Sequence, residues 1–201
     1  VKVKVVDQPL VIPCGVPFGI KMYTDGVLVV SMSDVDTAAG PFNPARSAGI
    51  KTGDVIVSIE GETVTTTEQV ARIVEESGGR TMTFHIRRDN IAFDIRFPPA
   101  LSVNENRWKA GLWVRDSSAG IGTLTFYDPE TNVFGGLGHA VCDVDTGEIL
   151  PISSGEIVPA RIYSIIKGVS GTPGELRGGF ESGSLGSLNV NGETGIYGAL
   201  S

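Results

Sequence analysis

The sequence predicts a mainly β fold with one or two short helices. Most apolar residues fall in short runs bounded by Gly, Pro, Asn and Asp, a pattern typical of strands joined by turns. Helical spacing of apolar residues is clear in only one stretch, which follows Thr65. A hydrophobic fraction of 41% and a charged fraction of 19% are typical of a globular protein, and 201 residues fit one or two domains.

Glycine use divides the chain into two parts. Nine of the 27 glycines lie in residues 1–101 and eighteen lie in residues 102–201. The change coincides with Phe97-Pro98-Pro99-Ala100, where two prolines favour an extended linker. We therefore predict an N-terminal extension at 1–11, a first domain at 12–98, a linker at 99–106 and a second domain at 107–201.

The first domain is expected to begin with strands. The runs Gly19–Met22 and Val27–Met32 predict two strands separated by a turn at Thr24-Asp25-Gly26. A loop is expected over Ala38–Ser47, and the next strand over Val55–Ile59. The order so far is strand, strand, loop, strand.

A helix and two further strands complete the first domain. Thr65 and Glu68 have capping-box spacing, so we expect the helix to begin just after Thr65 and to end at Gly78-Gly79. Apolar residues then alternate along a strand that contains Phe84, and the last strand is expected over Ile91–Phe97. The expected apolar face of the helix consists of Val70, Ile73 and Val74.

The second domain is expected to be almost entirely β. Its many short strands and Gly-rich turns indicate a barrel or a sandwich. Asp128–Asn132 is expected to be a turn, because Pro129 has the fixed φ that a turn favours. The clearest strand candidates are Leu112–Arg115, Gly122–Tyr127, Val133–Val141 and Ile162–Ile166.

Charge and composition exclude several classes of partner. The net charge is −7 and Lys and Arg form no basic cluster, which argues against nucleic acids and anionic membrane surfaces. No run approaches the roughly 18 apolar residues of a membrane span. Because the chain begins at Val1 and carries no secretory signal, we expect any membrane attachment to come only from a removed N-terminal segment.

Cysteine and histidine are too sparse for a zinc site of the usual kind, and no cofactor is expected. Cys14 and Cys142 are 128 residues apart and fall in different predicted domains. We interpret them as small buried apolar residues, with a disulfide between them as the alternative.

Two motifs point to peptide binding. Pro17-Phe18-Gly19-Ile20 opens a strand at a glycine, where successive backbone N–H groups can form a pocket for a terminal carboxylate. Pro44–Ile56 contains an alanine-glycine-hydrophobe turn followed by Gly53-Asp54. Together these motifs resemble bacterial PDZ domains over about residues 12–97. The resemblance implies a peptide groove between Gly19–Met22 and the helix at Thr66–Ser77, with Phe18, Gly19 and Ile20 as binding residues. The alternative is that Phe18 and Ile20 are only core residues.

His139 is the candidate catalytic residue. It follows an apolar, Gly-rich strand end, Phe134–Gly138, whose glycines permit close backbone approach and leave room for a substrate. Serine hydrolases need an imidazole within hydrogen-bond reach of a hydroxyl group. The other histidine, His85, is expected on the polar face of a strand in the first domain.

Several segments resemble a known peptidase family. Arg115–Thr131 is very similar to the opening of the SpoIVB peptidase domain, and Gly136–His139 with Asp143–Thr146 resembles the segment that holds the catalytic histidine of that family. Gly171–Glu175 with Phe180, and Gly195–Gly198, resemble further landmarks. With the PDZ-like region upstream, the resemblance covers nearly the whole chain.

This resemblance implies a serine endopeptidase with a chymotrypsin-like β-barrel, of which the chain would carry the first part. Such a peptidase is exported to the forespore intermembrane space, where it cleaves a regulatory membrane protein and so triggers activation of a late sigma factor. Its partners would be that protein substrate and a peptide ligand of the PDZ domain, either the regulatory protein or the peptidase itself. His139 would be the general base.

The rest of the catalytic triad does not carry over. The family's acid and serine lie beyond its last motif seen here, so we expect them beyond Ser201 and expect the chain alone to be inactive. Ser170 resembles a nucleophile turn, but it lies only 31 residues after His139, too few for a second barrel. We interpret Ser170 as a turn residue, and Asp143 and Asp145 as solvated turn residues. The alternatives are that Ser170 is the nucleophile and that Asp143 or Asp145 is the acid that orients His139.

Two other functions are compatible with these motifs. A non-catalytic PDZ-containing scaffold would use only the peptide groove. A HtrA-like protease is disfavoured, because that family usually places its PDZ domain after the peptidase domain.

Overall fold

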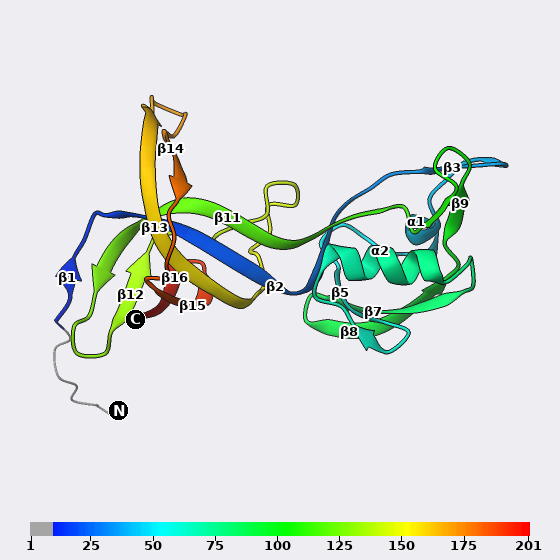
Figure 1. Ribbon diagram of the computed structural model, residues 1–201, viewed down its shortest axis with the longest axis horizontal. Coiled ribbons are helices and arrows are strands. Elements are labelled where there is room, and N and C mark those ends of the chain that lie inside the picture. Colours follow the sequence, from blue (N-terminus) through cyan, green and yellow to red (C-terminus); the bar gives the residue numbers. More distant parts are fainter. Residues whose placement is uncertain (1–9) are drawn as a thin grey trace, which may run out of the picture. The chain divides into compact units, whose positions relative to one another are not determined.

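The computed structural model describes residues 10–201, which form two compact units (Figure 1). Among these residues, unit 1 contains residues 10–21, Ala119–Val141 and Gly155–Ser201, and unit 2 contains Met22–Ser118 and Cys142–Ser154. The mainly β class with short helices is confirmed. The units do not follow the linear bounds 12–98, 99–106 and 107–201, which stay a prediction.

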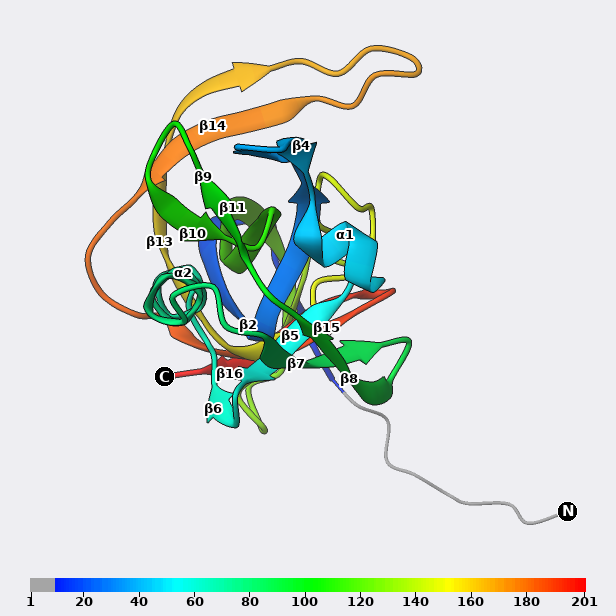
Figure 2. The same ribbon diagram turned by 90° about the vertical axis from the view of Figure 1, so that its right-hand side faces the viewer.

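Unit 2 is built on antiparallel strands around α2. Val27 and Leu28 of strand β2 (Pro17–Met32) pair with β5 (Val55–Ile59), which pairs with β7 (Met82–Arg88), and β7 pairs with β8 (Ile91–Phe97). The expected apolar face of the helix and the alternating residues of β7 are buried in one core with these strands. Figure 2 shows α2 almost along its axis beside this sheet. The smaller strands of unit 2 are β3 (Val35–Thr37), β4 (Gly40–Phe42) and β6 (Glu62–Thr63).

The helix α2 spans Thr67–Glu76 and begins one residue later than expected. Thr66 is the N-cap: its hydroxyl accepts from the Gln69 N–H at 3.2 Å, while Gln69 Oε1 accepts from the Thr66 N–H at 3.1 Å. The capping box therefore uses Thr66 and Gln69 instead of Thr65 and Glu68. Gly78 and Gly79 have φ of 61° and 85°, so the expected left-handed stop is present.

Two expectations about the start of unit 2 are wrong. The turn at residues 24–26 is absent, and β2 runs continuously through it. Gly26 serves a close approach instead, because a Cβ there would lie 2.7 Å from the Ile56 carbonyl oxygen. The expected loop Ala38–Ser47 contains β4 and most of α1 (Pro44–Ala48), a helix too short for apolar periodicity to reveal.

The expected linker is also structured. Within it, β9 (Ala100–Ser102) pairs antiparallel with β10 (Arg107–Lys109), and this hairpin belongs to unit 2.

Unit 1 contains a set of antiparallel strands around the buried side chain of Phe134. Strand β12 (Val133–Gly136) pairs with β11 (Leu112–Tyr127) on one side and with β16 (Gly195–Leu200) on the other. Strand β1 (Ile12–Pro13) pairs with the C-terminal end of β11, on the edge opposite β12. Strand β15 (Gly186–Gly192) joins β16 to β13 (Ile152–Ile166), which also pairs with β14 (Glu175–Phe180).

The strand lengths in the second part of the chain differ from those expected. Leu112–Arg115 and Gly122–Tyr127 are the two ends of the single strand β11, and Ile162–Ile166 is the end of the longer β13. The strand expected over Val133–Val141 stops at Gly136, because Leu137 and Gly138 have φ of 70° and 113°. Within residues 10–201, no helix is long and apolar enough to cross a membrane.

Candidate functional site

His139 lies on the exposed segment that follows β12. Its Nδ1 is 2.8 Å from the Ala140 carbonyl oxygen. A carbonyl oxygen only accepts, so in the neutral imidazole Nδ1 carries the proton and Nε2 retains its lone pair. This is the tautomer in which a histidine can take a proton from a hydroxyl group.

The glycines before His139 serve packing. A Cβ on Gly135 would lie 2.4 Å from the Phe126 ring, and one on Gly136 would lie 2.8 Å from the Phe18 ring. The expected close approach is therefore present, but aromatic side chains fill the space that was expected for a substrate.

Phe18, Gly19 and Ile20 lie in unit 1 and not in the unit that contains α2. Phe18 is 2% exposed and contacts Phe134 edge to face, with ring centroids 6.1 Å apart. A Cβ on Gly19 would meet the Phe180 ring at 2.5 Å, and Ile20 is also buried. These positions are those of core residues, and their role in peptide binding stays a prediction.

A groove that the sequence did not reveal lies beside α2 within unit 2. It has a volume of about 370 Å³ and is formed by one face of α2, the segment from Ser33 to Asp36 that leads into β3, the β9–β10 hairpin and the start of β11. Asp116 of β11 accepts a hydrogen bond from the Thr67 N–H at the start of α2, at 2.8 Å. This bond links β11, which forms part of one wall, to α2, which forms the other. Trp108 and Trp113, the two tryptophans of the chain, both line the groove. They were missed because they fall after the predicted domain boundary, although two tryptophans within six residues were a visible signal.

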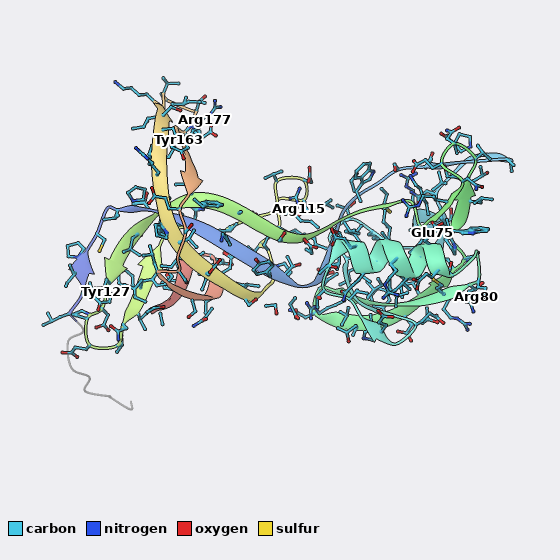
Figure 3. The ribbon with its side chains drawn as sticks, in the orientation of Figure 1. Glu75, Arg80, Arg115, Tyr127, Tyr163 and Arg177 are labelled. Atoms are coloured by element: carbon cyan, nitrogen blue, oxygen red, sulfur yellow. The ribbon has the colours of Figure 1, made fainter. Side chains whose placement is uncertain are left out.

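Two of the family-like motifs meet in unit 2. Arg115, which lies on β11 in Figure 3, donates to the carboxylate of Asp143 and, at 2.9 Å, to that of Asp145. Asp143 Oδ1 also accepts from the N–H groups of Asp145 and Thr146, at 3.0 and 2.9 Å. The interpretation of Asp143 as a solvated residue is wrong, because its side chain is fully buried and paired, whereas that of Asp145 is 46% exposed.

The other residues singled out in the sequence are Ser170, His85 and the two cysteines. Ser170 is exposed in the Gly-rich turn between β13 and β14, where the Val169 N–H and the Thr172 carbonyl oxygen are 2.9 Å apart. His85 Nδ1 is 2.7 Å from Asp94 Oδ1 on the neighbouring strand. Cys14 and Cys142 are both free; Cys14 is only half-buried and Cys142 is exposed, so the expectation of two buried thiols is wrong. Within residues 10–201, no group of three His, Cys, Asp or Glu side chains could hold a metal ion.

Comparison with known proteins finds relatives that are similar to part of the chain. A Brucella suis biovar 1 protein that is named as a zinc metalloprotease is 32% identical over 114 residues, which are 55% of this chain and 29% of that protein. A Brucella melitensis biotype 1 protein with the same designation has the same identity and coverage. Serine protease HTRA1 of Xenopus laevis is 41% identical over 59 residues, 29% of this chain and 12% of that protein. The chain thus spans less than a third of the length of these relatives.

Two family models match separate regions. Residues 35–88 match the PDZ domain, and residues 106–201 match SpoIVB peptidase S55. The PDZ match excludes Phe18, Gly19 and Ile20, whereas the peptidase match includes His139 and both tryptophans of the groove. The chain therefore contains a PDZ domain over residues 35–88 and a SpoIVB peptidase S55 region over residues 106–201, which together cover most of its length.

Proposed function

We propose that this chain is part of a serine endopeptidase in which His139 is the general base. The observation that carries the proposal is the hydrogen bond from His139 Nδ1 to the Ala140 carbonyl, which leaves the exposed imidazole with an unprotonated Nε2. The family match over residues 106–201 supports a proteolytic role for that nitrogen.

The biological role that we propose follows the family resemblance. The peptidase would act in sporulation signalling, exported to the forespore intermembrane space, where it cleaves a regulatory membrane protein and so triggers activation of a late sigma factor. The PDZ domain would bind a peptide segment of that protein or of the peptidase itself. We infer that the 201 residues alone are inactive, because an imidazole without its hydroxyl partner provides no covalent pathway.

A serine-directed fluorophosphonate tests the catalytic assignment. In the full-length gene product, His139→Ala should slow labelling at least about 1,000-fold, because the serine loses the base that accepts its proton. His85→Ala is the matched control and should label at the wild-type rate. The 201-residue chain should remain unlabelled by intact mass, and labelling at Ser170 would overturn the inferred inactivity. Equal rates for the two histidine variants would overturn His139 as the general base, and a wild-type full-length product that is not labelled would favour the non-catalytic scaffold.

We propose further that the groove beside α2 binds the peptide. Apolar side chains of Val70, Val74 and Leu112 line it together with both tryptophans, a composition suited to an extended peptide with apolar residues. The walls come from the PDZ match and from the start of the peptidase match, so a ligand would contact both regions.

Tryptophan fluorescence can report occupancy directly, because both tryptophans of the chain line the groove. Titration with synthetic peptides from a random C-terminal library should shift the emission for those that bind. Ala71→Arg adds a long side chain on the exposed, groove-lining face of α2 and should weaken binding more than about tenfold. Ala92→Arg, on the exposed part of β8, should bind like wild type. Equal affinity for the two variants would place the peptide elsewhere.

A further inference from the structure

The segment that carries His139 is fastened by one side chain on β15. Asn191 Oδ1 accepts a hydrogen bond from the Val141 N–H at 2.8 Å, and Asn191 Nδ2 donates to the Val141 carbonyl oxygen, also at 2.8 Å. Both backbone groups of Val141 are thus held by a single amide, in the manner of a β-bridge. All these residues belong to unit 1.

The same hairpin packs against the turn that precedes His139. Gly195, with φ of 137°, lies directly across from Asn191's neighbour Gly192 in the β15–β16 pair. A Cβ on Gly195 would lie 2.5 Å from the Gly136 carbonyl oxygen and 3.3 Å from the Gly138 nitrogen, so only glycine permits this contact. The His139 segment is therefore held before the histidine by β16 and after it by β15.

The two hydrogen bonds around His139 share one peptide group. The Ala140 carbonyl that accepts from His139 Nδ1 and the Val141 N–H that donates to Asn191 are opposite ends of the same planar unit. In a trans peptide these two groups point in opposite directions, so fixing the N–H also fixes the direction of the carbonyl. A continuous path runs from Asn191 Oδ1 through this peptide to the imidazole.

We propose that Asn191 is a positioning residue that holds His139 in the tautomer with the proton on Nδ1. By fixing the Ala140–Val141 peptide plane, it keeps the Ala140 carbonyl in line with Nδ1 and leaves Nε2 unprotonated. Polarisation along the hydrogen-bonded chain strengthens both bonds. The inference deepens the proposed function and rests on His139 acting as the general base.

The tautomer can be measured without any catalytic activity. In the 201-residue chain at about pH 9, where imidazoles are neutral, the ¹⁵N shifts of His139 should show the proton on Nδ1. In Asn191→Ala the His139 shifts should move towards a mixture of both tautomers, and the Val141 N–H should exchange with solvent about tenfold faster. The His85 shifts should stay unchanged. An unaltered His139 tautomer in Asn191→Ala would overturn the proposal.

Two more variants separate positioning from general loss of structure. Asn191→Asp keeps the acceptor for the Val141 N–H, so its His139 shifts should lie closer to wild type than those of Asn191→Ala. Asn189→Ala removes an exposed amide from the same strand and should leave the His139 shifts unchanged. If Asn189→Ala and Asn191→Ala alter the shifts equally, the effect belongs to the strand and the proposal fails.

Labelling of the full-length product by the fluorophosphonate links the tautomer to function. Asn191→Ala should slow labelling by up to about 100-fold, the loss expected when a catalytic group is misplaced by about 1 Å. If His139→Ala has no effect but Asn191→Ala alters the tautomer, the proposed function fails and the positioning holds. If His139→Ala abolishes labelling and the tautomer does not respond to Asn191→Ala, only the positioning fails.

Discussion

Asp54 is the acidic residue of the Gly53-Asp54 motif, and its side chain is fully buried. Arg88 donates to both of its carboxylate oxygens, at 2.5 and 2.7 Å, and the Lys51 N–H donates to Oδ2 at 2.8 Å. Hydrogen bonding to Asp54 raises the pKa of Arg88 above its ordinary value. The motif that marks the PDZ domain thus has a structural role: it supplies an acceptor for the last residue of β7.

Removing the arginine should be costly, because it would leave a buried carboxylate without its charged partner. We expect Arg88→Met to lower the free energy of unfolding by about 3–5 kcal/mol. Arg46→Met, which breaks the half-exposed pair with Asp34, should cost less than about 1 kcal/mol. Urea denaturation of both variants measures the difference, and similar losses would contradict the assignment of Arg88 as an essential partner of Asp54.

Candidate residues could be identified from the sequence more reliably than their surroundings. The identity of His139 came from neighbouring glycines and motif resemblance, and the structure adds its exposure and its contact with Ala140. Asn191 was missed because nothing in its own strand distinguishes it from Asn189. Its importance arises from contact with a residue 50 positions away, which no local pattern encodes.

The C-terminal end of α2 is joined to the β9–β10 hairpin. Glu75, labelled in Figure 3, accepts from the Trp108 N–H at 3.0 Å and pairs with Arg107 at 3.5 Å. The Trp108 ring covers Gly79, where a Cβ would lie 2.4 Å from the ring. The hairpin therefore forms one wall of the groove through its contacts with the end of this helix.

Two adjacent glycines offer a test of that packing. Gly78→Ala should cost about 1 kcal/mol, because its φ is positive but no atom lies within 4 Å of the added Cβ. Gly79→Ala should cost about 1–3 kcal/mol more, because the added methyl group meets the Trp108 ring. Denaturation in the Trp108→Ala background should bring the two costs together. A persistent difference there would show that Trp108 is not its cause.

Elements with a local signal were predicted well, and elements defined by pairing were not. The strand Ile91–Phe97 has the expected bounds, because Asp89-Asn90 with φ of 50° and 63° forms a tight turn before it. In contrast, β2 and β11 were each expected as two strands. Polar and glycine residues in their middles resemble turns, but pairing with strands distant in sequence keeps each of them a single strand.

For the whole chain, the sequence indicated the correct families but not the distribution of segments between units. Residues 107–118 and 142–154 lie within the SpoIVB peptidase S55 match, yet they pack in unit 2 together with the PDZ match. Contacts such as Arg115 with Asp143 hold them there. Composition changes mark a boundary along the chain, but they do not reveal a unit assembled from separate segments.

The discontinuous makeup of unit 2 has a consequence during translation. Its second segment ends at Ser154, so the ribosome must release that residue from the exit tunnel before the unit can close. Arg115 likewise lacks its partner until Asp143 has left the ribosome. Because a nascent chain grows by roughly 5–20 residues per second, the PDZ-containing unit stays incomplete for seconds. Folding of this region is therefore coupled to synthesis of the segment just beyond His139.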